Sequence, residues 1–163
     1  MEPIYINAFV RAIQNVFSTM FRLPIEIGEP QEKPADAARQ DVSGIIGVSG
    51  SIVGTIVLSM PFKSADAITM LFTDRRLETD SPDYADAVGE IVNMICGGAK
   101  ASFQREDVLI SCPTVVIGPG HFISQLSGTE CVQIPCKTDC GEVILEVALR
   151  GAYEQPAMTN HAA

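Results

Sequence analysis

Basic residues are scarce in this sequence. Its 163 residues include 11 Lys and Arg against 20 Asp and Glu, so the formal net charge is −9 and the isoelectric point lies near 4.6. No Lys/Arg-rich run occurs anywhere along the chain. Proteins that bind the phosphate backbone of nucleic acids carry clustered Lys and Arg side chains. The composition therefore argues against a nucleic-acid partner.

Long apolar runs are also missing. A membrane-spanning helix needs about 20 consecutive apolar residues, and Gly or Ser interrupts the longest apolar stretches of this chain. The opening MEPIYINAFVRAIQ lacks the basic start and the small-residue cleavage site of a secretory signal. We therefore expect a cytoplasmic protein with no membrane segment.

Cysteine is limited to 5 residues, an odd number that fits poorly with a disulfide framework. In a reducing cytoplasm we expect free thiols. Zinc ribbons bind metal through C-x-x-C pairs, and no such pair occurs, so Cys131, Cys136 and Cys140, with or without Cys112, are expected to be small apolar residues instead of metal ligands. A Cys nucleophile assisted by His121 has no supporting sequence context. We predict no metal site and no bound cofactor.

Hydrophobic residues make up 47% of the chain, enough for the core of a domain of this length. We expect one domain over residues 1–151 and a flexible tail over 152–163. Segment 29–41, rich in Pro, Ala and charge, is expected to be an exposed loop. The apolar spacing predicts helices over 4–21, 64–73 and 82–104, a strand over 24–28, a hairpin from 42–50 and 51–61, and strands over 108–118, 121–127, 130–137 and 142–150.

Local signals mark the boundaries of several of these elements. Gly50 and Ser51 predict the hairpin turn, and Gly118-Pro119-Gly120 predicts another turn. Ser64 is expected to cap the second helix, while Ser81 followed by Pro82 should begin the third. Runs of strands beside helices, without regular βαβ alternation, predict an α+β fold. We expect a two-layer α/β sandwich, with a mainly antiparallel sheet and helices packed on one face.

The predicted helix 82–104 has two different faces. Its apolar side should face the sheet and comprises Tyr84, Val88, Ile91, Val92, Ile95, Ala99 and Phe103. The opposite side comprises Asp86, Glu90, Asn93, Gly97, Lys100 and Gln104, with Gly89 at its border. Glu90 and Asn93 are three residues apart, so their side chains are neighbours. The missing side chain of Gly97 leaves a flat surface that a partner's backbone can approach.

A carboxylate beside a carboxamide suits one kind of chemistry. An amide donates one hydrogen bond and accepts another, so Asn93 can hold a water in line with a phosphorus atom, as phosphoryl transfer requires. Glu90 fits an electrostatic anchor for a cation of the partner better than a general base, since its carboxylate is expected to be exposed. The alternative is that this face is merely solvated.

The segment GEIVNMICGGAK closely resembles the E-x-x-N motif of the CheC/CheX/FliY family of chemotaxis phosphatases. The chain is most similar to the CheX branch, because the first predicted helix has no second motif: Ile4 and Ala12 stand three residues before Asn7 and Asn15. The resemblance implies an α/β sandwich and a homodimer that joins sheets edge to edge.

The resemblance also implies an activity. The substrate would be the aspartyl phosphate of a phosphorylated CheY-like response regulator, with Asn93 orienting the attacking water and Glu90 pairing with the receiver domain's lysine. The Mg²⁺ of the reaction would belong to the receiver. The docking surface around the pair would comprise Asp86, Gly89, Gly97, Lys100 and Gln104. The alternatives are a non-catalytic signalling module, or a switch-complex-like structural subunit, that binds a receiver through the same face.

Overall fold

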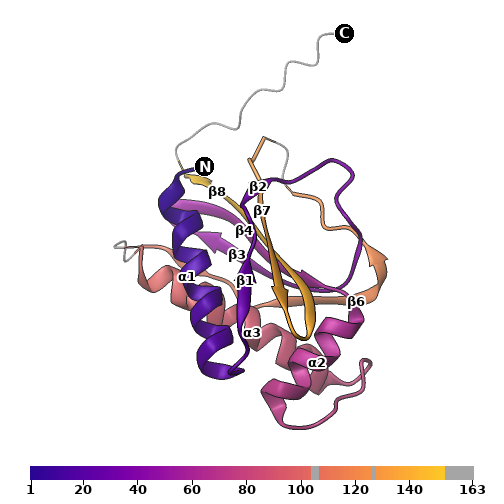
Figure 1. Ribbon diagram of the computed structural model, residues 1–163. Coiled ribbons are helices and arrows are strands. Elements are labelled where there is room, and N and C mark those ends of the chain that lie inside the picture. The colour runs from indigo at the N-terminus through magenta and orange to yellow at the C-terminus, as the bar shows by residue number, and fades with distance from the viewer. Residues whose placement is uncertain (104–106, 126–127, 153–163) are drawn as a thin grey trace.

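A long antiparallel hairpin forms the centre of the sheet in the computed structural model, which describes residues 1–103, 107–125 and 128–152 (Figure 1). Its strands are β3 (Gln40–Ser49) and β4 (Ile52–Met60). The other elements are α1 (Pro3–Met20), β1 (Ile25–Ile27), β2 (Gln31–Glu32), α2 (Phe62–Thr73), α3 (Pro82–Ala101), β5 (Leu109–Ile110), β6 (Thr114–His121), β7 (Val132–Thr138) and β8 (Gly141–Gly151).

The sheet has the strand order β1-β7-β8-β4-β3-β5, with β2 also pairing with β7 and β6 also pairing with β3. Every pairing is antiparallel. Alternate residues of the central strands, such as Ile46, Ile56 and Val147, are cross-strand neighbours and fully buried. They form one core with the buried faces of the helices. The predicted α+β sandwich with a mainly antiparallel sheet is thereby confirmed.

The hairpin turn lies where Gly50 and Ser51 predict it. Gly50 has a φ of 112°, a region that side chains other than Gly rarely adopt. A Cβ atom there would also lie 2.0 Å from the carbonyl oxygen of Asp107. The carboxylate of Asp107 accepts a hydrogen bond from the Ser51 backbone N–H at 3.0 Å, which fixes the turn to the segment after α3.

Helix α3 begins as predicted. Pro82 is its first residue, and the Ser81 side-chain oxygen accepts a hydrogen bond from the Tyr84 backbone N–H at 3.3 Å. The prediction for α2 was wrong at its start, because Ser64 lies inside the helix and is buried. The helix begins at Phe62, whose backbone N–H donates instead to the carboxylate of Asp41 at 3.1 Å, a residue distant in sequence.

The predicted strand 108–118 is two strands, β5 and β6, separated at residues 111–113. The turn predicted at Gly118-Pro119-Gly120 is also wrong, because β6 runs through these residues to His121. Of the predicted strand 121–127, residues 122–125 are not a strand, and 126–127 lie outside the described residues. A register shift between Gln40 and Val42 on the paired strand accommodates the irregularity. Residues 118–120 have no paired residue on β3 and form a bulge, in which Gly120 has a φ of 66° and donates its backbone N–H to the carboxylate of Asp41 at 3.1 Å.

Segment 29–41 is mostly exposed, as predicted, but it is not all loop. Gln31 and Glu32 form β2, which pairs with β7. The Lys33 side chain is 9% exposed and forms an ion pair of 2.8 Å with Glu146, whose side chain is 6% exposed. Glu146 lies on the sheet face opposite the helices, since its neighbours in β8, Leu145 and Val147, belong to the core. This segment therefore covers part of the far face of the sheet.

Contacts on two sides hold α3 in place. Gly44 on β3 allows close approach, because a Cβ atom there would lie 2.9 Å from Cγ1 of Val92. Along its side, α3 packs against α1. Just beyond the end of α3, Phe103 makes an edge-to-face contact with Tyr5 of α1, at 5.4 Å between ring centroids. Figure 1 shows the two helices next to each other on the sheet. Among the described residues, no helix is both long and apolar enough to cross a membrane.

Candidate functional site

Glu90 and Asn93 lie side by side on the outer face of α3. Glu90 is exposed and Asn93 half-buried, and the Asn93 amide nitrogen lies 3.5 Å from a Glu90 carboxylate oxygen. This distance is at the long limit for a hydrogen bond. The amide oxygen and most of the donor capacity of Asn93 therefore stay available to a visiting molecule.

The remaining predicted surface residues occupy different environments. Asp86 is exposed, and Gly97 and Lys100 are half-buried on the same face as the pair. A Cβ atom at Gly97 would find nothing within 4 Å, so the surface next to Asn93 is open. Gly89 is buried, and a Cβ atom there would lie 3.1 Å from Cγ of Pro113. Gln104 lies outside the described residues.

A groove separates this face of α3 from β6. It has a volume of about 510 Å³ and is lined by Ala85, Asp86, Gly89, Glu90, Pro113 and Val115. Sequence reasoning did not find the contribution of Pro113 and Val115, because only long-range sheet pairing brings β6 beside α3. The burial of Gly89 follows from the same arrangement: this glycine forms the floor of the groove instead of an exposed contact surface.

The site is negatively charged. Glu90 and Asp86 have no basic partner among the ion pairs of the described residues, whereas Asp83, one turn earlier on α3, pairs with Arg75. The open carboxylates therefore present negative charge to whatever approaches this face. Within residues 1–103, 107–125 and 128–152, no group of three His, Cys, Asp or Glu side chains could hold a metal ion.

The cysteines lie apart from this face, except for Cys112, which is exposed next to Pro113. Cys96 and Cys136 are buried, and burial raises the pKa of each thiol to about 12. Burial, reinforced by the negative charge of Glu146, raises the pKa of Cys131 to about 12 as well, although Lys33 opposes the change. Such thiols stay protonated at neutral pH, whereas a cysteine nucleophile has to be a thiolate.

A serine and a histidine also meet outside the α3 face. Nε2 of His121 lies 2.8 Å from the Ser43 hydroxyl, which in turn lies 2.7 Å from the Ser59 hydroxyl. The other ring nitrogen of His121 lies 2.8 Å from the carbonyl oxygen of Gly118. Ser43 has no exposed surface, so no substrate can reach its hydroxyl. The arrangement ties β6 to the two central strands.

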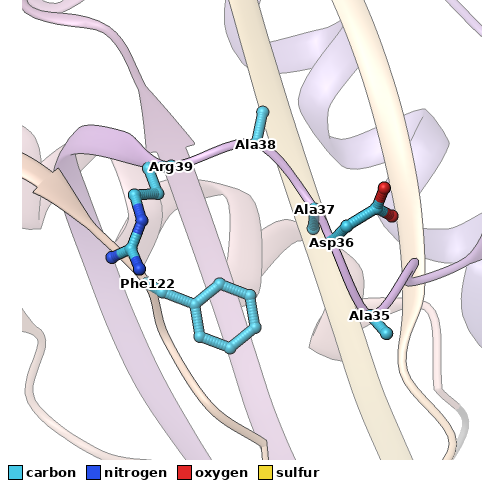
Figure 2. Close-up of a pocket in the computed structure, with 6 residues that line it drawn as sticks. All are labelled: Ala35, Asp36, Ala37, Ala38, Arg39 and Phe122. Atoms are coloured by element: carbon cyan, nitrogen blue, oxygen red, sulfur yellow. The ribbon is translucent and has the colours of Figure 1, made fainter.

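A second hollow lies on the far face of the sheet, with a volume of about 440 Å³ (Figure 2). Its lining consists of Ala35, Asp36, Ala37, Ala38, Arg39 and Phe122. In Figure 2 the Asp36 carboxylate points away from Arg39 and Phe122. The Arg39 guanidinium donates to the carbonyl oxygen of Gly120 at 3.0 Å. Because its charged groups do not converge, this hollow does not form a catalytic arrangement.

Comparison with known proteins identifies the family. The family model of the chemotaxis phosphatase CheX matches residues 42–137, which include the whole of α3 and the groove. The chain belongs to the CheX family. The CheX resemblance predicted from GEIVNMICGGAK is therefore confirmed, together with the CheC/CheX-like fold.

Solved structures of CheX proteins share this fold over nearly their whole length. A chemotaxis protein CheX from Desulfovibrio desulfuricans is 32% identical with a TM-score of 0.81, over 90% of this chain and 98% of that one. CheX from Vibrio vulnificus is 30% identical with a TM-score of 0.82, over 90% and 99% of the two chains. No curated protein matches the sequence.

A more distant structure has a bound partner. It is a complex of CheX with CheY, BeF₃ and Mg²⁺ from Borrelia burgdorferi, 24% identical with a TM-score of 0.75, over 90% of this chain and 97% of that one. At this level of identity the likeness is one of fold.

Proposed function

We propose that this protein accelerates hydrolysis of the aspartyl phosphate on a CheY-like response regulator. Asn93 orients the attacking water and Glu90 anchors the receiver domain's lysine. The observation that carries the proposal is the pair itself: a carboxylate and a carboxamide lie side by side on the accessible face of one helix. Membership of the CheX family and the CheX–CheY complex of a distant relative support the choice of substrate.

The geometry suits a reaction in which the two proteins each supply part of the site. A water attacks phosphorus in line with the bond to the aspartyl oxygen, which leaves with the bonding electrons and yields free carboxylate and inorganic phosphate. The Asn93 amide oxygen accepts one hydrogen bond from the water, fixing its direction. Mg²⁺ held by the receiver stabilises the charge that develops on the phosphoryl oxygens. No covalent intermediate forms on this protein.

Rigid support for Asn93 is important to this mechanism, because positioning contributes most of the rate in such a reaction. The back of α3 is fixed against the sheet by Val88 and Val92 at Gly44, and its side against α1. Each chain would carry one such site, because the two asparagines of α1, Asn7 and Asn15, have Ile4 and Ala12 where the motif requires Glu.

We also propose that the protein forms a homodimer through an edge of its sheet. In the described part of the chain, β6 pairs only with β3, so its other edge is free for hydrogen bonding. An unpaired edge strand is a ready template for pairing with another chain. The opposite edge consists of β1 and β2, which are much shorter.

The experiment follows phosphate release from a phosphorylated CheY-type receiver with Mg²⁺ at increasing concentrations of the protein. We expect wild type to hasten release and Glu90→Ala to require higher concentrations for the same effect. The control is Asn15→Ala, an alanine substitution at an exposed asparagine of α1 outside the candidate site, and it should act as wild type. If wild type binds the phosphorylated receiver without hastening its decay, the non-catalytic binding module is correct instead.

A further inference from the structure

The groove between α3 and β6 extends the candidate site beyond Glu90. One of its walls carries the carboxylates of Glu90 and Asp86, which are four residues apart and so neighbours along the helix. The other wall is apolar and consists of Pro113 and Val115. The floor is formed at Gly89, where an added Cβ atom would pack tightly against Pro113, at 3.1 Å from its Cγ. The groove is therefore charged on one side and apolar on the other.

This division matches the side chain of a lysine or an arginine. Both have an apolar stem of several methylene groups and a charged end, and they bury the stem against apolar surface while the charge stays solvated. A purely apolar side chain in the groove would offer no positive charge to pair with the Asp86 carboxylate. Within the described residues Asp86 has no cation of its own, in contrast to Asp83, which pairs with Arg75.

We infer that the groove binds a second basic side chain of the receiver domain, with its stem against Pro113 and Val115 and its charge at Asp86. This inference rests on the proposed function, in which Glu90 holds the receiver's first lysine. Because Glu90 also lines the groove, a receiver bound at Glu90 must cover it.

Two ion pairs one helical turn apart, at Glu90 and Asp86, would fix the orientation of a bound receiver, which a single ion pair does not. A single ion pair at Glu90 leaves the receiver free to rotate about that contact. A second pair at Asp86 fixes the direction of the receiver along α3 and so aligns its phosphoryl group with Asn93. Asp86 is then a specificity-determining residue, because a receiver with an acidic side chain at the facing position is repelled.

The test measures binding instead of hydrolysis. The probe is the CheY-type receiver that wild type dephosphorylates, held in its phosphate-like state with Mg²⁺ and beryllofluoride. We expect Asp86→Asn to weaken binding by roughly tenfold or more, as loss of a close interfacial charge pair does. The matched control is Asp83→Asn, which changes net charge equally on the same helix but outside the groove, and should stay within about twofold. Asp86 is exposed, so folding is not at risk.

A charge exchange identifies the partner side chain. Each surface Lys and Arg of the receiver is changed to Glu and tested against wild type and Asp86→Lys. We expect one receiver variant that binds wild type poorly and regains affinity with Asp86→Lys. If no variant does so, or if Asp86→Asn and Asp83→Asn behave alike, the inference is overturned. The proposed function stands in that case as long as wild type still hastens phosphate release, and it fails independently if wild type does not.

Discussion

The glycine next to the Glu90–Asn93 pair predicts a conflict between stability and activity. Gly97→Ala adds one methyl group to α3 at a position where nothing lies within 4 Å of the new Cβ atom. The methyl group therefore gains no packing and suffers no collision. The change in folding free energy should be the difference in helix propensity alone, about 0.5–1 kcal/mol in favour of Ala. For a protein of this size that corresponds to a rise in Tm of about 1–4 °C.

The same methyl group should harm the reaction. Gly97 follows Asn93 by one helical turn on the same face, so the added group lies where a receiver's backbone would approach. A displacement of the reacting groups by about 1 Å can cost 100-fold in rate. We expect the rate of dephosphorylation per unit concentration to fall about tenfold or more, measured by phosphate release in the unsaturated range.

Gly98→Ala is the matched control. Its Cβ atom would lie 3.4 Å from Cβ of Ala12, an ordinary contact on the side of α3 that faces α1. The propensity gain is the same, and the methyl group lies away from the Glu90–Asn93 pair. We expect Gly98→Ala to raise Tm similarly and leave the rate unchanged. If Gly97→Ala stabilises the protein and keeps full activity, close approach of a receiver does not explain the glycine beside Asn93.

Three further predictions concern stability. Ser81→Ala removes the cap of α3 and should cost about 1 kcal/mol of unfolding free energy in a urea titration, with m unchanged. Lys33→Met leaves the buried Glu146 carboxylate without its cation and should lower the free energy of unfolding by about 3–5 kcal/mol. Gln125 and Gln133 also donate hydrogen bonds to Glu146. A loss below about 1 kcal/mol would show that these two hydrogen bonds are enough to stabilise the buried carboxylate. Burial raises the pKa of Cys96 from 9.0 to about 12. The contribution of its protonated thiol to the free energy of unfolding is therefore fully present well below pH 9 and is lost as the pH rises further. Between pH 9 and 10.5 wild type should lose about 1.1 kcal/mol per pH unit more than Cys96→Ala, and equal slopes would contradict this.

The sequence predicted α3 and the hairpin well because their signals are local. Ser81 and Pro82 mark the start of the helix, and apolar residues repeat with its period, so its buried and exposed faces could both be assigned. Gly50 marks the hairpin turn because its φ of 112° favours glycine. The positions of Glu90 and Asn93 on one accessible face followed from their spacing alone.

Features that depend on contacts between distant segments were not predictable in this way. The Gly118-Pro119-Gly120 stretch has a strong local preference for a turn, yet it forms a bulge within β6, because the residues on either side, Ile117 and His121, pair with β3. Lys33 resembles an ordinary loop lysine, and only the fold brings it to Glu146. Gly89 is at the border of the polar face on a helical wheel, and the presence of Pro113 decides that it is buried.

The role proposed for Asn93 is to orient the water, not to raise the affinity for the partner. Phosphate release from a phosphorylated receiver at saturating concentrations of protein separates the two roles, because differences in binding then no longer matter. We expect Asn93→Ala to bind the beryllofluoride-loaded receiver about as well as wild type, and to release phosphate no faster than the receiver does alone. A saturating rate for Asn93→Ala equal to that of wild type would contradict this role.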